Sequence, residues 1–533
     1  MTWLPLLGAC TPSTRPTRPE LAPPPSSTAL PSPEPLARTE LPIGVQIFED
    51  DVTTPALEHL RAAGVAWART RALWKLIEPE PRDPPAYDWS VTDRLFGDAT
   101  AAGFRNLAVV YANPAWVSQP ECLPVPPAHA ERYAAFWQAL VERYDGDGRA
   151  DAPNGAVVGW WQVGNEPDFD PRSAAAATEG DYGSCFGDDP AAYAEQLRRA
   201  ALAIRAADPG ARIGFGPLAW DRFTAETAPA GWTAPPGPFA ADFGQRALEH
   251  LYRAHAGEPG LPFFDFVGLH SYNDNAHFWD GPEPPLASEL LGRLAAFRAE
   301  QLALPGVYDL RRMPILVSET GLASGPSDEW TERGEDWQAV YVGQTMVRAQ
   351  APGVVAAIWY TARDNIVGDC LPPHWDWLSF GLMRADDYLD ALVSRCPAQD
   401  WVDAEAYAPG ADGAAPKPAL EALANLTRAL GGYSFERQLS ASETGSAAIE
   451  AYRFRGPGGR TLLAAWTTTG ARLGRRGDER ITARLRVDAR WLAPWTGRVS
   501  ARPHLGPAVS LGADGEASVE LLVNQAPVYL TTE

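Results

Sequence analysis

Two glutamates near the ends of short apolar segments are the residues of this chain best suited to chemistry. Glu166 lies in the run 157–167 (VVGWWQVGNEP), and Glu319 lies in the run 314–321 (PILVSETG). Such runs fit strands that are buried on both faces, and barrels of these strands hold their catalytic groups at the C-terminal strand ends. An acid that protonates the leaving oxygen and a carboxylate that attacks the anomeric carbon together cleave a glycosidic bond. We therefore expect the two side chains to point into one site.

Alternating strand and helix patterns surround both glutamates. The apolar runs are Ile43–Phe48, Val65–Thr70, Asn106–Tyr111, Val157–Val163, Arg212–Gly216, Phe264–Leu269, Ile315–Ser318 and Val354–Tyr360. The amphipathic segments are Thr54–Ala63, Thr92–Ala102, Ala128–Tyr144, Pro190–Ala207, Ala240–His255, Ser288–Leu302 and Trp337–Ala351, with a closing helix at Ala419–Leu430. This alternation predicts an α/β fold, a (β/α)₈ barrel over residues 41–430.

The pattern changes after residue 430. Short strand-like segments separated by glycine turns follow, at Ile449–Phe454, Thr461–Trp466, Ile481–Val487, Arg498–Ala501 and Ala517–Val523. Short strands without intervening helices are typical of an all-β sandwich. We expect residues 431–533 to form a small C-terminal domain of this kind.

The composition excludes some partners. The chain has 533 residues and a formal net charge of −22. Nucleic-acid binding needs clustered Lys and Arg to meet phosphates, so this balance argues against nucleic acid. The 20 tryptophans suit either a core or the stacking of sugar rings, which is consistent with a carbohydrate substrate.

The N-terminal segment predicts export. Leu7-Gly8-Ala9-Cys10 resembles the signal box of a bacterial lipoprotein, in which Cys10 would be lipidated, although residues 1–10 contain no Lys or Arg. Residues 11–40 are rich in Pro, Ser and Thr and fit a disordered tether. We expect a cell-surface or periplasmic lipoprotein, or a secreted protein, whose membrane contact is limited to this anchor. The oligomeric state stays open.

Four further cysteines are consistent with export. Shared loop neighbourhoods favour the pairs Cys122–Cys185 and Cys370–Cys396. Other connectivities, or four free thiols in a cytoplasmic protein, remain alternatives. No Cys-x-x-Cys spacing occurs, so we expect no zinc site.

The segments around the two glutamates resemble a known group of enzymes. Asn165-Glu166-Pro167 and Ser318-Glu319-Thr320-Gly321, on the fourth and seventh runs, resemble the acid/base and nucleophile motifs of the clan A retaining glycoside hydrolases. Further segments resemble family 39 and family 5-like enzymes of that clan, namely residues 65–69, 74–79, 87–89, 111–116, 380–382 and 416–419. The resemblance covers most of residues 42–430.

The resemblance implies a retaining hydrolase of β-glycosidic bonds. Glu319 would attack to form a glycosyl-enzyme, with Glu166 as general acid and then general base. Asn165 would donate its amide to the sugar 2-hydroxyl. Arg69 would keep Glu319 ionised, although Arg71 lies on the same strand face and is the alternative. The mechanism needs no cofactor or metal.

The remaining implied residues bind the sugar or orient the acids. His270 and Tyr272 are two apart and so share a strand face. Tyr272 would donate a hydrogen bond to the nucleophile, and His270 would contact the sugar or the acid/base. Trp359 would form the apolar floor under the reacting sugar, and Asn113 would contact the substrate from the third strand end.

Two other functions fit the same residues. One is a carbohydrate-binding surface lipoprotein that has lost turnover, and the other is a transglycosylase in which a sugar hydroxyl replaces water. The sequence leaves the sugar, the linkage and endo or exo attack open, because the loops after each strand set subsite shape.

Overall fold

The computed structural model describes thirteen segments of the chain. They are residues 41–49, 54–170, 183–220, 240, 242–272, 290–324, 335–364, 379–384, 415–468, 482–488, 490–496, 498–512 and 518–532. Cys10, the tether predicted over residues 11–40, Cys370 and Cys396 lie outside these segments. The predicted domain boundaries stay predictions.

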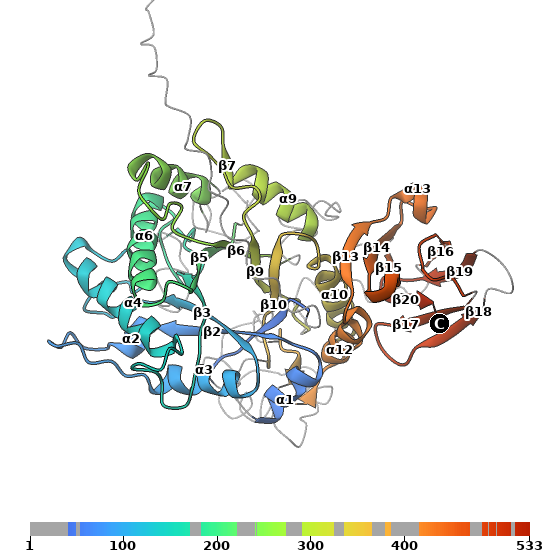
Figure 1. Cartoon of the computed structure of the whole chain (residues 1–533), viewed down its shortest axis with the longest axis horizontal. Helices are drawn as coiled ribbons and strands as arrows, with labels where there is room; N and C mark the ends of the chain where they lie inside the picture. Colours follow the sequence, from blue (N-terminus) through green and yellow to red (C-terminus); the bar gives the residue numbers. More distant parts are fainter. Residues whose placement is uncertain are drawn as a thin grey trace, which may run out of the picture.

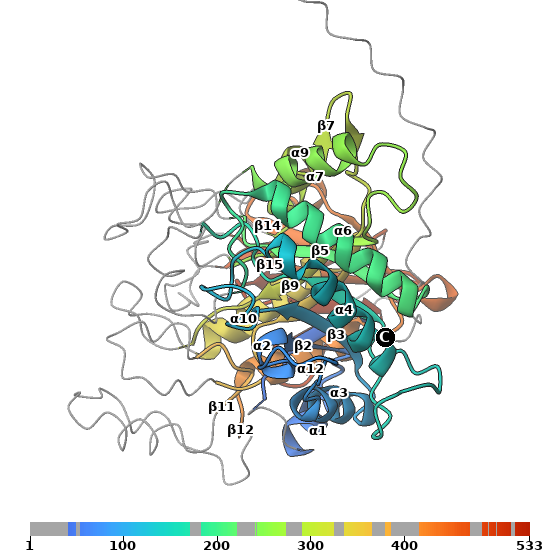
Figure 2. The ribbon, with the colours of Figure 1, turned by 90° about the vertical axis from the view of Figure 1, so that its left-hand side faces the viewer.

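Eight parallel strands close into a barrel in the order β1-β10-β9-β6-β5-β4-β3-β2 (Figures 1 and 2). The strands are β1 (Ile43–Gln46), β2 (Trp67–Leu73), β3 (Arg105–Tyr111), β4 (Trp160–Val163), β5 (Arg212–Leu218), β6 (Phe266–His270), β9 (Ile315–Thr320) and β10 (Val354–Trp359). Each predicted apolar run supplies one of them. The predicted (β/α)₈ fold is therefore confirmed.

Helices connect successive strands on the outside of the barrel (Figure 1). They are α1 (Thr54–Ala62), α2 (Trp74–Ile77), α3 (Ser90–Ala101), α4 (Ala130–Tyr144), α6 (Pro190–Ala207), α7 (Phe243–Ala254), α9 (Leu290–Glu300), α10 (Glu335–Arg348) and α12 (Pro418–Leu430). The start of α6 shows how the sequence sets a boundary, because the Asp189 side chain accepts the Ala192 N–H at 3.0 Å and Pro190 occupies the first turn. Two short ladders pair β7 (Ala303–Leu304) with β8 (Tyr308–Asp309) and β11 (Met383–Arg384) with β12 (Ala415–Pro416).

The half of the barrel interior farther from the C-terminal strand ends is apolar. Side chains of six strands pack there as one cluster, and Trp67 and Trp160 meet edge to face at 5.0 Å between ring centroids. Glycines make room for these rings, since a Cβ on Gly214 would lie 2.5 Å from the Phe266 ring. This filled layer supports the polar layer nearer the C-terminal strand ends.

That polar layer begins two residues later on the same strands. Arg69 follows Trp67 and Gln162 follows Trp160, so each points to the same side of its strand as the preceding indole. Gln46 of β1 joins them, and all three side chains are buried. Because side chains alternate along each strand, these polar groups lie next to the apolar layer, on its side nearer the mouth of the barrel.

The C-terminal strands form two antiparallel sheets. The first has the order β13-β14-β15-β20-β17-β18, and the second pairs β16 with β19. Their bounds are β13 (Ser434–Gln438), β14 (Ile449–Arg455), β15 (Thr461–Thr467), β16 (Ala483–Asp488), β17 (Arg498–Pro503), β18 (Val509–Gly512), β19 (Ser518–Val523) and β20 (Val528–Thr532); the short helix α13 (Ala441–Thr444) follows β13. The predicted sandwich is confirmed, and β13, β18 and β20 are additional strands that the sequence pattern did not predict.

Both faces of β15, in the middle of the larger sheet, are buried. Leu463 and Ala465 of β15 pack toward the smaller sheet, whereas Leu462 and Trp466 belong to the same hydrophobic cluster as the barrel helices. Successive side chains of a strand point to opposite faces, so the continuous apolar run of β15 serves two interfaces. The C-terminal sheets accordingly lie against α10 and α12 (Figure 1).

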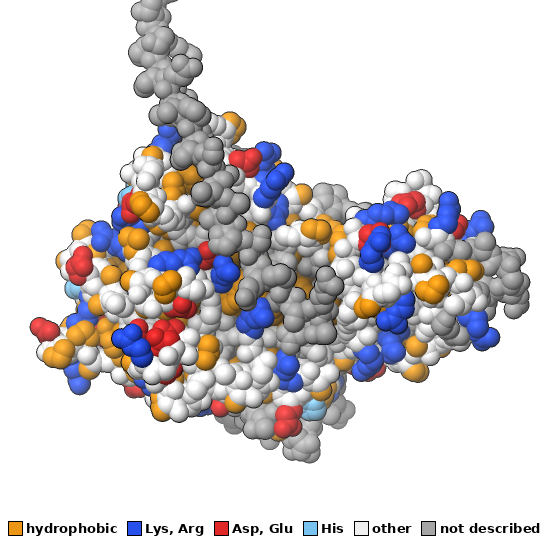
Figure 3. All heavy atoms as spheres, in the orientation of Figure 1, with side chains coloured by type: hydrophobic (Ala, Val, Ile, Leu, Met, Phe, Trp, Pro, Cys, Tyr) orange, Lys and Arg blue, Asp and Glu red, His pale blue; other side chains and the backbone are white. Residues whose placement is uncertain are grey.

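The surface of the described residues is mixed in charge. On the face drawn in Figure 3, acidic and basic side chains are interspersed over the barrel and the C-terminal sheets. Within the described segments, no helix is both long and apolar enough to cross a bilayer.

Candidate active site

Glu166 and Glu319 lie at the same end of the barrel. Glu319 is part of β9, and Glu166 follows the last residue of β4 by three positions. A carboxylate oxygen of each and a ring nitrogen of His270 all lie within 4.8 Å of one another. The two carboxylates are 21% and 12% exposed. The fold thus brings them together from positions 153 residues apart (319 − 166) in a place that solvent reaches.

The backbone of Glu166 is held in an unfavourable conformation. Its φ is +46°, in the left-handed region that costs a residue with a Cβ about 1–2 kcal/mol. The Glu166 N–H donates to the Pro217 carbonyl at 2.9 Å, and its own carbonyl accepts the Phe169 N–H at 3.0 Å. Such outliers persist where surrounding contacts enforce them and cluster at functional sites. The strain supports a functional role for this turn.

Arg69 organises the floor of the site. Its Nη1 donates to Glu319 Oε1 at 2.7 Å and its Nη2 to Asn165 Oδ1 at 2.6 Å. Gln46 and Gln162 accept further hydrogen bonds from the same guanidinium. The alternative residue, Arg71, instead pairs with Glu49. The structure therefore places Arg69, and not Arg71, against the candidate nucleophile.

The second oxygen of Glu319 is also held. The Tyr272 hydroxyl donates to Oε2 at 2.8 Å. Burial acts to raise the pKa of Glu319, but the charges on His270 and Arg69 and the hydrogen bonds from Tyr272 and Arg69 outweigh it and hold this pKa below its usual value. The side chain is therefore an ionised, oriented carboxylate at neutral pH. Burial beside this carboxylate raises the pKa of Tyr272 well above its usual value, so the phenol stays a donor.

His270 lies between the two acids. Its Nδ1 is 2.8 Å from Glu166 Oε1 and 3.4 Å from Glu319 Oε2. The opposite ring nitrogen, Nε2, is buried with no hydrogen-bond partner among the described residues. Of the two contacts expected for His270, the structure provides the one with the candidate acid/base.

Trp359 does not form the floor expected of it. The indole is 0% exposed, donates its Nε1–H to the Phe380 carbonyl at 2.9 Å and packs on Tyr341. Ile358 fills the barrel interior, so the following residue must point outward to the helices. Tyr360 is the partly exposed aromatic at this strand end, and its ring is 6.4 Å from that of Tyr272. The alternation along β10, counted from Ile358, would have identified it.

Asn113 holds a loop together. Its side-chain nitrogen donates to Ser118 Oγ at 2.9 Å and to the Leu123 carbonyl at 2.7 Å. Both amide hydrogens are thereby engaged, and the residue is 6% exposed. The structure thus gives Asn113 a role in ordering the segment after β3, and the substrate contact expected from the sequence stays a prediction.

A disulfide braces the loop that carries Glu166. Cys122 and Cys185 are bonded with Cα atoms 5.1 Å apart, which is one of the two expected pairs. The neighbouring Ser184 N–H donates to the Asn165 carbonyl at 2.7 Å, and the Phe186 N–H donates to the Pro167 carbonyl at 3.0 Å. The segment after β3 and the segment before α6 therefore clamp the acid/base turn from one side.

Replacing both Cys122 and Cys185 by Ser should destabilise the protein by about 2–4 kcal/mol, the usual value of such a cross-link. The bond closes a separation of 63 residues, so its loss frees much of the unfolded chain. Urea unfolding with and without reductant measures the effect, and kcat should also fall because Glu166 loses its brace. An unchanged urea midpoint in the double variant would contradict this expectation.

Asp168 lies in the same loop as Glu166, and the sequence pattern did not identify it as a site residue. Its carboxylate is buried and accepts the backbone N–H groups of Trp220 at 2.7 Å and Ala219 at 3.1 Å. It ties the end of β5 to the turn of Glu166, two residues away. Burial raises its pKa from 3.8 to about 7, with the charge on Glu166 adding to the rise.

This raised pKa predicts a pH-dependent stability. The folded state binds the Asp168 proton more tightly than the unfolded state, so the contribution is present below about pH 4 and lost as pH rises through about 7. Its slope approaches about 1.4 kcal/mol per pH unit. Urea unfolding from pH 5 to 8 should show the wild type losing stability relative to Asp168→Asn as pH rises. A difference that stays constant with pH would count against the buried acid.

Three groups of described side chains have a geometry that could hold a metal ion. They are Glu166/His270/Glu319, Glu195/His250/His255 and Asp145/Asp147/Asp151. In the first group the Arg69 guanidinium already pairs with Glu319, and its charge disfavours a second cation. The third is a loop of acidic side chains, a common surface feature. The second group lies between two helices and is treated below.

Comparisons with known proteins find similarity in structure. No protein-family model matches the chain, and no curated protein matches it significantly in sequence. A family 39 glycoside hydrolase from Bacteroides cellulosilyticus superposes with a TM-score of 0.60 at 18% identity, covering 93% of this chain and 81% of that one. A glucosidase from Croceicoccus marinus gives a TM-score of 0.55 at 15% identity, over 93% and 96% of the two chains.

A monomeric β-xylosidase from Caulobacter crescentus is also similar, with a TM-score of 0.53 at 17% identity over 94% of this chain and 97% of that chain. At these identities the likeness concerns the fold. The expected likeness in fold to a family 39 glycoside hydrolase is confirmed by the first of these structures, which covers 93% of this chain.

Proposed function

We propose that this protein is a retaining glycoside hydrolase that cleaves β-glycosidic bonds, with Glu319 as nucleophile and Glu166 as acid/base. The observation that supports it best is the approach of the two carboxylates within 4.8 Å at the C-terminal ends of β4 and β9. The likeness in fold to several glycoside hydrolases supports the same class of reaction.

In the first step Glu319 attacks the anomeric carbon of the bound sugar. The bond to the leaving oxygen breaks, that oxygen takes the electron pair, and the proton of Glu166 moves to it. The products are a glycosyl ester on Glu319 and a free alcohol. Arg69 and Tyr272 each hold one oxygen of Glu319, so the nucleophile is oriented before substrate arrives.

In the second step Glu166, now a carboxylate, takes a proton from water. The resulting hydroxide attacks the anomeric carbon, and Glu319 leaves as the free carboxylate. The short separation supports retention, because inverting enzymes place their carboxyl groups about 6.5–9.5 Å apart to admit a water between them. Asn165 lies beside Glu166 and is held by Arg69, a position that suits contact with the sugar.

Covalent trapping tests the assignment. A 2-fluoro-β-glycoside with a good leaving group should add one sugar per chain, and mass spectrometry of peptides should locate it on Glu319. The matched control is Glu49→Gln, which removes a carboxylate of the same type near the barrel mouth, one that pairs with Arg71. A sugar on any other residue, or none from a broad panel, would overturn the proposal.

Two related functions are separable outcomes. A transglycosylase would be trapped in the same way but would form new glycosides at high acceptor concentration. A carbohydrate-binding protein without turnover would bind sugars and release no leaving group. Aryl β-xylosides and β-glucosides are the first substrates to test, because a β-xylosidase and a glucosidase share this fold.

We also propose that the protein is exported and anchored through Cys10. The Leu7-Gly8-Ala9-Cys10 segment and the tether-like composition of residues 11–40 support this, as does the Cys122–Cys185 disulfide, a bond favoured in oxidising compartments. Labelled fatty acid should be incorporated by the wild type and not by Cys10→Ala during bacterial expression. Equal labelling of both would contradict the anchor.

A further inference from the structure

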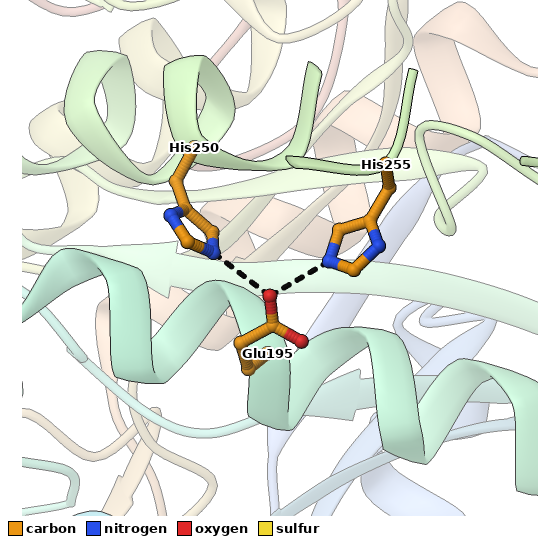
Figure 4. A group of neighbouring side chains, drawn as sticks. All are labelled: Glu195, His250 and His255. Atoms are coloured by element: carbon orange, nitrogen blue, oxygen red, sulfur yellow. Dashed lines mark hydrogen bonds and ion pairs between the residues drawn. The ribbon is translucent and has the colours of Figure 1, made fainter. Parts of the chain in front are cut away.

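Two imidazoles and a carboxylate converge between α6 and α7, outside the barrel (Figure 4). Glu195 projects from α6, His250 lies on α7, and His255 follows the last residue of α7. The Nε2 atoms of His250 and His255 are 2.8 and 2.7 Å from the same oxygen, Glu195 Oε1. The two imidazole nitrogens and the carboxylate oxygen therefore lie close together, although they come from two different helices and the residue after one of them.

A supporting pair of side chains orients one of the imidazoles. His255 Nδ1 is 2.9 Å from Glu258 Oε2, and Glu258 in turn accepts the Arg198 Nε–H at 3.0 Å. A metal-bound histidine commonly donates its other ring N–H to a carboxylate, which sets the tautomer and strengthens the ligand. When neutral His255 donates its Nδ1–H to Glu258, its Nε2 carries no proton and can bind a metal ion.

We propose that Glu195, His250 and His255 form a Zn²⁺ site that joins α6 to α7. Two neutral imidazoles and one carboxylate are a common three-ligand set for zinc, with water as the fourth ligand. Zn–N and Zn–O bonds of about 2.0–2.1 Å require the two N···O separations to open by only about half an ångström. The side chains of Glu195, His250 and His255 are 35%, 32% and 16% exposed, so an ion can enter from solvent.

The site is distinct from the candidate active site. Glu195 lies on α6 after β4, and the two histidines lie on and directly after α7, which follows β5. Glu166 and Glu319 instead lie at the strand ends. The bound ion would tie these helices at one point on the outside of the barrel. The proposal does not depend on the proposed glycosidase activity. The sequence alone gave no sign of it, because Glu195 is 55 residues before His250.

The test is zinc titration of the full-length chain after removal of metals with a chelator. Calorimetry should show one Zn²⁺ per chain, and Co²⁺ in its place should give the visible absorption of a tetrahedral site. His250→Ala and His255→Ala should weaken binding by at least about 100-fold, because each removes a direct ligand. Glu258→Gln should weaken it by about 10- to 100-fold, the usual effect of losing the group that orients a ligand.

Glu319→Gln is the matched control, because it alters the other described cluster that contains a histidine. It should bind Zn²⁺ as the wild type does. The proposal is overturned if the wild type and the His255→Ala variant bind equally, or if Glu319→Gln abolishes binding. Should an alanine variant fail to fold, Glu258→Gln decides, since it leaves all three donors in place; unchanged affinity in that variant would then reject the site.

Discussion

Glu319→Gln should lower kcat/KM for every glycoside substrate by about 10⁴-fold or more, the order of effect of removing a nucleophile or its partner in other hydrolases. Gln has nearly the same shape as Glu but no charge with which to attack. Arg69 and Tyr272 hold both oxygens of Glu319, so the substitution leaves most of the surrounding hydrogen bonds possible. The loss should therefore appear in kcat with a folded protein, as circular dichroism and thermal unfolding will show.

The companion variant Glu166→Gln separates the two roles. With a dinitrophenyl leaving group, which needs no proton, glycosyl-enzyme formation should stay fast while its hydrolysis becomes slow. A burst of one leaving group per chain should precede a slow steady-state release. Azide should increase the steady-state rate, because it attacks the glycosyl-enzyme without a general base. If Glu166→Gln shows no burst and Glu319→Gln does, the two assignments are reversed.

Glu450→Gln should destabilise the protein by about 3–5 kcal/mol, the usual cost of breaking a buried ion pair from one side. Glu450 of β14 pairs with Arg348 of α10 at 2.7 Å, and their side chains are 5% and 2% exposed. Trp466 Nε1 also donates to Glu450. The substitution removes the Glu450 charge that faces the buried Arg348 guanidinium between the barrel and the C-terminal sheets.

The pKa of Glu450 indicates how this effect depends on pH. Burial acts to raise it, but the charge and hydrogen bonds of Arg348, with those of Tyr452 and Trp466, hold it below its usual value. A lowered pKa stabilises the fold above the unfolded value near 4.3, and that stability is lost as pH falls through the folded value. The free energies of unfolding of the wild type and of Glu450→Gln should therefore converge at acidic pH.

An exposed ion pair supplies the control for Glu450→Gln. Asp309 and Arg311 pair at 2.7 Å with side chains 58% and 59% exposed, so Asp309→Asn should change the free energy of unfolding by less than about 1 kcal/mol. Urea unfolding of the three proteins gives the comparison. Equal small effects in both variants would show that the buried pair does not hold the interface.

Much of the barrel was predictable from local pattern. Strands buried on both faces need continuous apolar residues, and the helices between them need one apolar face. The patterns of segments such as Ile315–Ser318 and Pro190–Ala207 therefore predicted a strand and a helix, and the second segment coincides with α6. The edge strand β13 did not, because its residues Ser434–Gln438 are mostly polar and exposed.

The side chains around the glutamates were less predictable. Trp359 and Tyr360 are adjacent in the chain, yet only one can face the barrel mouth, and that depends on the register set by Ile358. Asp168 and Gln162 have no local pattern that marks them, since their partners come from β5 and from Arg69 of β2.

The sequence by itself determined the eight-fold repeat and the strand ends that carry Glu166 and Glu319, which follow from periodicity. The resemblance to clan A hydrolases implied Tyr272 as a neighbour of Glu319, and His270 shares its strand face because the two are two residues apart. Only the tertiary structure decided the distance between the two acids, the choice of Arg69 over Arg71, and the meeting of Glu195 with His250 and His255. Each of these depends on how separate strands and helices pack in three dimensions, and no local pattern encodes that.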